Sequence, residues 1–326
     1  LPLNGNPRED AQAREAFNAG AAALFVPESE LENALTVLAN HGQSQRSRES
    51  EHPMALRHPA SPHLPMPAWA PTEVSGSAMS ALDRWFVELV QANPQLRIRI
   101  GNPDELASNK MGATLALLKH RVNVPEPGVP ESTDGSVVTA LNEEAVAAAA
   151  LANKGGLNLI VSYEAFAVKM LGLIRQEIIF ARRQKELGQP PGWISIPLVV
   201  TSHTWENSKN EQSHQDPTIG EALLGEMSDT ARVLFPVDEN TACAALRAVY
   251  ASRGQVACVV VSKRDTPNHF SAAAAQSLIE HGAAHVAGDP STAQLQFVAI
   301  GAYQLEEAPK AHARLEHHGL ASCITV

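Results

Sequence analysis

The sequence predicts an α/β fold whose centre is a six-stranded parallel sheet with helices on both faces. Short apolar runs rich in β-branched residues recur through the middle of the chain, and segments with helical periodicity separate most of them. This alternation is typical of a parallel sheet, because its strands are buried on both faces and each crossover is usually a helix. The expected strands are residues 96–100, 137–140, 157–161, 194–200, 233–235 and 256–261.

The composition is that of an acidic protein of roughly two domains. The chain has 326 residues, and its 25 Lys and Arg against 35 Asp and Glu give a net charge of −10 with His neutral. No basic run stands out, so we expect no nucleic-acid partner. No apolar run reaches the roughly 18 residues of a membrane span, and no signal pattern opens the chain, so we expect a cytoplasmic protein without a membrane partner. The cysteines, Cys243, Cys258 and Cys323, are expected to be buried thiols.

Residues 1–71 are expected to form a helical segment followed by an extended linker. Ser29 and Glu32 have the spacing of a capping box, and leucines at helical spacing accompany them, which predicts an amphipathic helix that ends near Gly42. From residue 43 to residue 71 the periodicity vanishes and six prolines are interleaved with Ser, Arg and His. The histidines of this tract fit no metal-ligand template, so we interpret it as a solvated linker.

Two α/β domains are expected after the linker. Residues 72–266 contain the six strands. Residues 267–326 open a second domain, in which we expect a helix at 272–281, a strand at 295–300, a helix at 305–318 and a strand at 321–326. Since this last run stops with the chain, and the first residue is Leu1, we expect a fragment of a longer polypeptide.

Polar residues follow several of the predicted strands, at the edge where open α/β sheets bind ligands. Two of these segments, 101–110 and 142–150, carry acids that also suit the first turn of a helix. The aromatic pair within 162–166 could also belong to the core, as such pairs usually do. In 262–265, Lys263 and Arg264 form either a phosphate site or an ordinary charged strand exit.

The loop 202–216 carries the densest chemistry in the chain. It holds two histidines, a tryptophan, a lysine, two asparagines and an aspartate, and it follows a buried strand. A solvated surface loop is the alternative interpretation. We favour a ligand-binding loop, because a bare connection needs fewer hydrogen-bonding groups and no tryptophan.

Together these segments resemble the phosphoketolases, transketolase-like enzymes that use thiamine diphosphate. Residues 101–111 resemble the family's G-P-D-E-x-x-S-N-R stretch, and residues 162–166 match S-Y-E-A-F. Residues 213–217 match [ST]-H-Q-D-P, and Lys263 falls at the lysine of G-K-Q-P. The four motifs occur in the family's order. The resemblance implies a thiamine diphosphate-binding fold, with the pyrimidine-binding domain complete and the carboxyl-terminal domain begun.

The resemblance implies which residues bind the cofactor. Glu143 aligns with the glutamate that hydrogen-bonds N1′ of the aminopyrimidine. Asn142-Glu-Glu replaces the family's S-E-H, which leaves Glu144 as the alternative. Tyr163 and Phe166 match the aromatic segment against which the aminopyrimidine packs.

Other matching residues are implied to bind or convert the substrate. Ser108, Lys110 and Lys263 match residues near the sugar phosphate, although lysine at position 110 lacks the two-pronged guanidinium of the family's arginine. His214 matches a histidine that faces the substrate and is suited to proton transfer.

The middle of the loop departs from the family. Better-known phosphoketolases read W-R-Q-D-H-N-G-F where this chain has Trp205-Glu-Asn-Ser-Lys-Asn-Glu-Gln. Asn210 is kept, but Lys209 replaces a histidine that is implied to assist the loss of water that separates phosphoketolase from transketolase chemistry. We expect both residues to be catalytic, with lysine as a substitute proton donor.

The resemblance also implies a cofactor held jointly with another subunit. The family's Mg²⁺ and the diphosphate are held by a domain with a G-D-G motif, which Gly288-Asp-Pro does not provide. We therefore expect a homodimer or a larger oligomer. The implied activity is that of a lyase, which cleaves xylulose 5-phosphate or fructose 6-phosphate with inorganic phosphate to give acetyl phosphate. The alternatives are transketolase-like transfer to an aldose and a catalytically silent subunit.

Overall fold

A computed structural model describes residues 5–41, 61–103, 106–206, 216–226 and 229–326. The chain divides into two compact units, Leu1–Arg57 and His58–Val326, and each is described by itself. Among the described helices, none combines the length and the apolar character that crossing a membrane requires.

The first unit contains two helices, α1 (Ala11–Ala23) and α2 (Glu28–His41). The Asp10 carboxylate caps α1 by accepting a hydrogen bond of 2.8 Å from the backbone nitrogen of Ala13. The helix expected from the leucine spacing is present as α2. Its leucines at positions 31, 35 and 38 are exposed within this unit.

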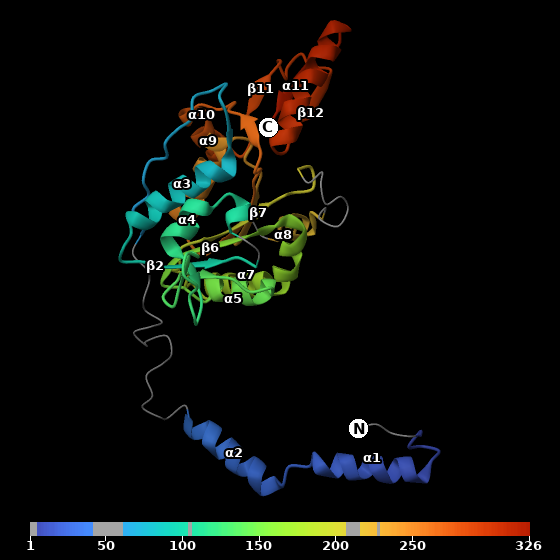
Figure 1. Ribbon diagram of the computed structural model, residues 1–326. Helices are drawn as coiled ribbons and strands as arrows, with labels where there is room; N and C mark the ends of the chain where they lie inside the picture. Colours follow the sequence, from blue (N-terminus) through green and yellow to red (C-terminus); the bar gives the residue numbers. More distant parts are fainter. Residues whose placement is uncertain (1–4, 42–60, 104–105, 207–215, 227–228) are drawn as a thin grey trace. The chain divides into compact units, whose positions relative to one another are not determined.

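The centre of the second unit is a parallel sheet of eight strands in the order β4-β3-β5-β2-β6-β7-β9-β8 (Figure 1). This confirms the predicted fold class, and all six expected strands are present. They are β2 (Arg97–Gly101), β5 (Val137–Val138), β6 (Gly156–Tyr163), β7 (Ile196–Thr201), β8 (Ala231–Leu234) and β9 (Val256–Val260). The count of six is corrected to eight by β3 (His120–Arg121) and β4 (Glu131–Ser132), two-residue edge strands that are too short to leave a periodic pattern.

Helices cover both faces of the sheet. On one face lie α3 (Ala78–Gln91), α4 (Gly112–Leu118) and α9 (Glu239–Ala251); on the other lie α5 (Glu143–Leu151), α7 (Leu171–Glu186) and α8 (Thr218–Leu224). Alternate residues of β6 serve the two cores, since Leu159 and Val161 pack on the first side and Ile160 on the second. A short helix, α6 (Glu164–Ala167), and a 3₁₀ turn, η3 (Val168–Met170), lead from β6 into α7.

Residues 61–71, the last part of the expected linker, form no helix or strand but lie against the core. The indole Nε1 of Trp85 donates to the carbonyl of Pro65 over 3.0 Å. The Asn93 side chain accepts from the backbone nitrogen of His63 and donates to its carbonyl, both over 2.8 Å. These side chains of α3 and of the residues that follow it hold the segment on the surface of the sheet domain.

The carboxyl-terminal segment begins with β10 (Asp265–Pro267), which pairs antiparallel with β1 (Ser75–Ser77). It then forms a three-stranded sheet, in the order β11-β13-β12, with two helices. The elements expected here are present as α10 (Ala272–His281), β12 (Leu295–Val298), α11 (Ala302–His317) and β13 (Ser322–Thr325). The sequence does not predict β11 (His285–Ala287), because this strand has only three residues. It pairs antiparallel with β13.

All three cysteines are buried free thiols, as expected. Burial raises the pKa of Cys243 to about 12 and that of Cys258 further still. Both therefore stay protonated near neutral pH and are unsuited to nucleophilic chemistry.

Candidate functional site

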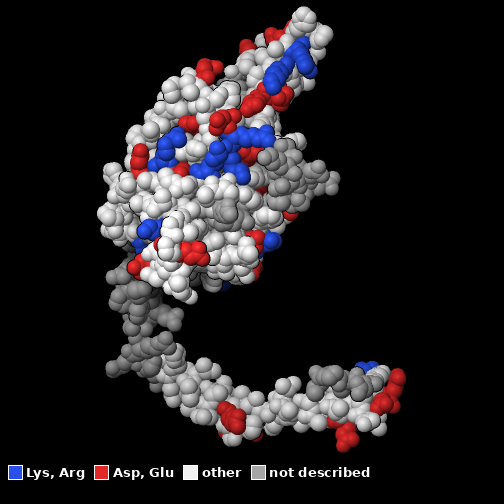
Figure 2. Space-filling model, viewed as in Figure 1, with Lys and Arg blue, Asp and Glu red and all other residues white. Residues whose placement is uncertain are grey.

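The candidate site lies where four parallel strands end. Strands β2, β6, β7 and β9 are neighbours in the sheet, so the segments that follow them meet at one edge. Figure 2 shows Lys and Arg side chains gathered in a band across the second unit, although the chain has a net charge of −10. This edge therefore combines the polar segments that the sequence singled out.

Tyr163, the last residue of β6, and Phe166, in the short helix that follows, form the aromatic centre of the site. Their ring centroids are 5.9 Å apart and their planes are tilted by 43°. The phenol oxygen of Tyr163 lies 2.9 Å from Oγ of Ser108, in the turn η2 (Ala107–Asn109) that comes after β2. The Nζ of Lys263, after β9, lies 4.5 Å from the centroid of the Tyr163 ring. Three predicted residues that are far apart in the chain thus meet around one ring.

Glu143, in the first turn of α5, is linked to the aromatic pair through Lys169. The side chain of Asn142 caps this helix by accepting a hydrogen bond from the backbone nitrogen of Ala145. Glu143 Oε1 lies 2.8 Å from Nζ of Lys169, and the Glu143 side chain is only 13 % exposed. The same Nζ lies 5.1 Å from the centroid of the Phe166 ring. A carboxylate, an ammonium group and an aromatic face are therefore in contact.

The neighbouring Glu144 points elsewhere. It is exposed and lines a shallow surface groove with Gly172 and Gln176 of α7. A Cβ placed on Gly172 would lie 3.8 Å from Oε1 of Glu144. Of the two adjacent glutamates, Glu143 is the one that pairs with the lysine over the Phe166 ring.

The structure says less about the remaining predicted site residues. Lys110 is exposed and ends the turn η2 in the left-handed conformation, with φ of 62°. Lys209, Asn210 and His214 lie outside the described residues.

The sequence does not single out Glu206, which lies in the described part of the loop after β7. Its side chain is buried, and its Oε1 accepts hydrogen bonds from the backbone nitrogens of Lys263 (2.7 Å) and Arg264 (2.9 Å) and from Ser262 Oγ (3.2 Å). The sequence does carry a signal for this residue: directly after Trp205, this chain has a glutamate where the family has an arginine. The carboxylate fixes the segment that carries Lys263.

Glu164 and His203 are two further buried groups beside the site. Oε2 of Glu164 accepts hydrogen bonds from the backbone nitrogen (2.7 Å) and the hydroxyl (2.9 Å) of Thr204. Burial raises the pKa of Glu164, although the hydrogen bonds from Thr204 favour its charged form. Burial lowers the pKa of His203, whose ring centroid lies 5.6 Å from that of Tyr303, so the imidazole is held neutral near pH 7.

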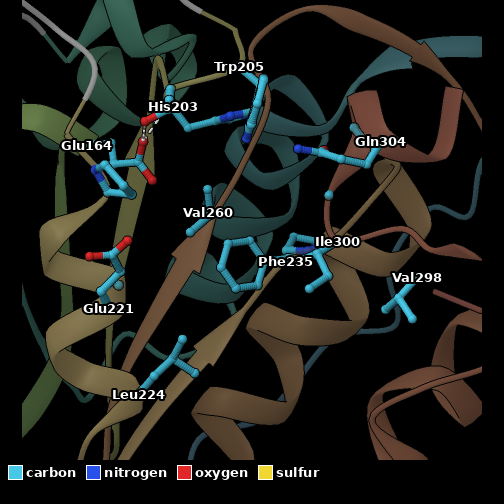
Figure 3. A pocket seen from close by; sticks show the side chains of 16 residues that line it. Glu164, His203, Trp205, Glu221, Leu224, Phe235, Val260, Val298, Ile300 and Gln304 are labelled. Atoms are coloured by element: carbon cyan, nitrogen blue, oxygen red, sulfur yellow. Dashed lines mark hydrogen bonds between the residues drawn. The ribbon is translucent and has the colours of Figure 1, made fainter. Parts of the chain in front are cut away.

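Both groups line a pocket of about 490 Å³, shown in Figure 3. Its other walls are mostly apolar, with Glu221 and Gln304 as polar members, and come from α8, from the ends of β8 and β9 and from the segment that leads from β12 into α11. Phe235, Val260 and Ile300 are among these wall residues (Figure 3). The pocket thus lies between the sheet domain and the carboxyl-terminal segment, next to the aromatic centre rather than at it.

Within the described ranges, no group of three or more His, Cys, Asp or Glu side chains could hold a metal ion. The polar groups at the sheet edge instead suit an organic ligand with an aromatic part, near Glu143 and Phe166, and an anionic part, near Ser108 and Lys263.

The fold places the chain in the class of transketolase-like α/β proteins. A transketolase from Leishmania mexicana is 20 % identical, with a TM-score of 0.61 over 78 % of this chain and 35 % of that one. A solved chain described as a split-gene transketolase in an inactive β4 tetramer is 16 % identical, with a TM-score of 0.51 over 76 % of this chain and 70 % of that one.

Within this class, the chain belongs to the D-xylulose 5-phosphate/D-fructose 6-phosphate phosphoketolase family. The family's sequence model matches residues 80–252, more than half of the chain. A "probable phosphoketolase" of Mycobacterium avium is 26 % identical over 273 residues, which are 79 % of this chain and 33 % of that protein. The resemblance seen in the motifs is therefore confirmed, and the chain spans about a third of the length of this curated relative.

Proposed function

We propose that this chain is the pyrimidine-binding part of a thiamine diphosphate-dependent phosphoketolase. The observation that supports this most is the continuous set of contacts from Glu143 through Lys169, Phe166 and Tyr163 to Ser108 and Lys263. All of these residues except Lys169 were assigned to the cofactor or the substrate from motifs alone.

The residues present fit the aminopyrimidine of the cofactor. A carboxylate that is 13 % exposed can hold a proton on N1′, and the rings of Tyr163 and Phe166 offer an aromatic surface beside it. Because it pairs with the lysine that lies over the Phe166 ring, we assign Glu143 rather than Glu144 as the cofactor glutamate. When bound, thiamine diphosphate supplies the carbon nucleophile that cleaves the ketose.

Substrate binding is assigned to the cations at the strand ends. Ser108 and Lys263 both contact Tyr163 and would hold the sugar phosphate, with Lys110 as a further cation next to the turn that carries Ser108. Glu206 would orient this site by fixing the backbone of residues 262–264. His214, Asn210 and Lys209 are assigned to proton transfer and substrate binding by the resemblance alone.

The proposed reaction cleaves xylulose 5-phosphate or fructose 6-phosphate with inorganic phosphate and releases acetyl phosphate and an aldose phosphate. The proposed enzyme is a cytoplasmic homo-oligomer, in which Mg²⁺ and the cofactor diphosphate are held by a diphosphate-binding domain of another subunit.

Transketolase-like transfer to an aldose is the second candidate, because Lys209 replaces the histidine expected to assist dehydration. The test supplies the complete protein with thiamine diphosphate, Mg²⁺, phosphate and xylulose 5-phosphate and measures acetyl phosphate. Acetyl phosphate supports the first proposal. New sugar phosphates after addition of an aldose, without acetyl phosphate, support transfer. If neither product is formed, the chain is a catalytically silent subunit.

A further inference from the structure

Lys169 contacts the Glu143 carboxylate and the Phe166 ring, the two groups that the aminopyrimidine would contact. Its Nζ is 2.8 Å from Oε1 of Glu143 and 5.1 Å from the centroid of the Phe166 ring. An ammonium group that is paired with a carboxylate and lies over an aromatic face occupies the same two partners as a protonated heteroaromatic ring.

From this placement, and on the basis of the proposed function, we infer that Lys169 is an internal competitor of the cofactor. It must leave Glu143 before the aminopyrimidine can bind, so it sets the affinity for thiamine diphosphate. This role concerns a residue that no sequence motif singled out.

The exposure of the two partners shows which of them can move. The side chain of Lys169 is 58 % exposed, whereas that of Glu143 is 13 % exposed and is carried by the first turn of a capped helix. The lysine can therefore swing into solvent at little cost, while Glu143 stays in place. Lys169 lies in η3, directly after the short helix α6, so no long helix has to shift for the exchange.

The size of the effect follows from the two interactions that are lost. An exposed ion pair and an exposed ammonium–ring contact are each weak, so their combined removal should change affinity by about three- to tenfold. Such an effect tunes the affinity for the cofactor without preventing its binding.

The chain offers a matched control in Lys154. Its Nζ lies 2.5 Å from Glu177 and 4.6 Å from the centroid of the Trp193 ring, and its side chain is 41 % exposed. This arrangement also consists of a lysine, a glutamate and an aromatic ring, but none of these three residues is assigned to the site.

The experiment measures the Kd of thiamine diphosphate with Mg²⁺ by titration calorimetry, on the complete protein and its variants. Lys169→Met should lower the Kd by about three- to tenfold, while Lys169→Arg and the control Lys154→Met should stay within about twofold of the wild type. In a Glu143→Gln background, which has no carboxylate to release, Lys169→Met should change the Kd by less than about twofold. Thermal melting of each variant checks that it is folded.

The outcomes separate this inference from the proposed function. If the wild type binds the cofactor and Glu143→Gln weakens binding, but Lys169→Met leaves the Kd unchanged or raises it, the inference is overturned and the proposed function stands. If neither the wild type nor Lys169→Met binds the cofactor, the proposed function fails and the inference fails with it.

Discussion

The carboxylate of Glu206 accepts a hydrogen bond of 2.7 Å from the backbone nitrogen of Lys263, and a second of 2.9 Å from that of Arg264. An acidic side chain from the loop after β7 thereby occupies two backbone donors that follow β9. Any phosphate near Lys263 must consequently be held by side chains, because these two amide groups are already satisfied.

Replacing Glu206 by alanine should lower the free energy of unfolding by on the order of 3 kcal/mol, because three buried or partly buried donors at residues 262–264 lose their acceptor. Urea unfolding of the purified chain measures this loss. The control is Glu186→Ala, an exposed residue paired with Arg183, for which we expect a change within about 0.5 kcal/mol. Equal effects of the two substitutions would show that Glu206 does not hold the loop.

Glu143 and Glu144 are predicted to differ sharply in importance. In the complete enzyme, Glu143→Ala should reduce kcat by at least about 100-fold, because the proton at N1′ loses its partner. Glu144→Ala should change kcat by less than about twofold, since its side chain is exposed and lines a surface groove beside α7. Acetyl phosphate formation measures both. Loss of activity from Glu144→Ala alone would reverse the assignment.

The contact between Ser108 and Tyr163 should contribute to binding of the sugar phosphate. Tyr163→Phe keeps the ring beside Lys263 but removes the hydroxyl that lies 2.9 Å from Ser108, so we expect KM to rise about three- to tenfold. Ser108→Ala should have a similar effect. The double variant should be little worse than either single variant if the two hydroxyls act as a pair. Fully additive effects on KM would contradict this pairing.

Glu164 should make stability depend on pH. Burial raises its pKa in the folded chain, so the folded state keeps a proton that the unfolded state releases as pH rises above about 4.3. Stability should therefore fall as pH rises from the unfolded pKa through the raised folded pKa. Glu164→Gln removes this loss of stability. The free energy of unfolding of the variant minus that of the wild type should therefore be more positive at pH 8 than at pH 4. Urea midpoints across this range measure the difference. A constant difference between the two proteins would show that the carboxyl does not titrate in this window.

The strands of the sheet could be predicted from sequence because each is a local run of apolar residues. The strands β6, β7 and β9 are buried almost throughout, and the apolar composition of each strand predicts this burial. Strands β3, β4 and β11 could not be predicted, because two or three residues carry no periodicity and are defined by the partner with which they pair.

The candidate site divides in the same way. The sequence by itself determined the class of fold, the family motifs and the residue types at the strand ends, since these depend on local pattern. Only the tertiary structure decided that Glu206 binds amides 57 and 58 residues away along the chain, and that Glu143 rather than Glu144 pairs with Lys169, 26 residues later, which lies over the Phe166 ring. These relationships arise because the parallel strands end at one edge, where the packing of helices on the sheet sets the direction of each side chain.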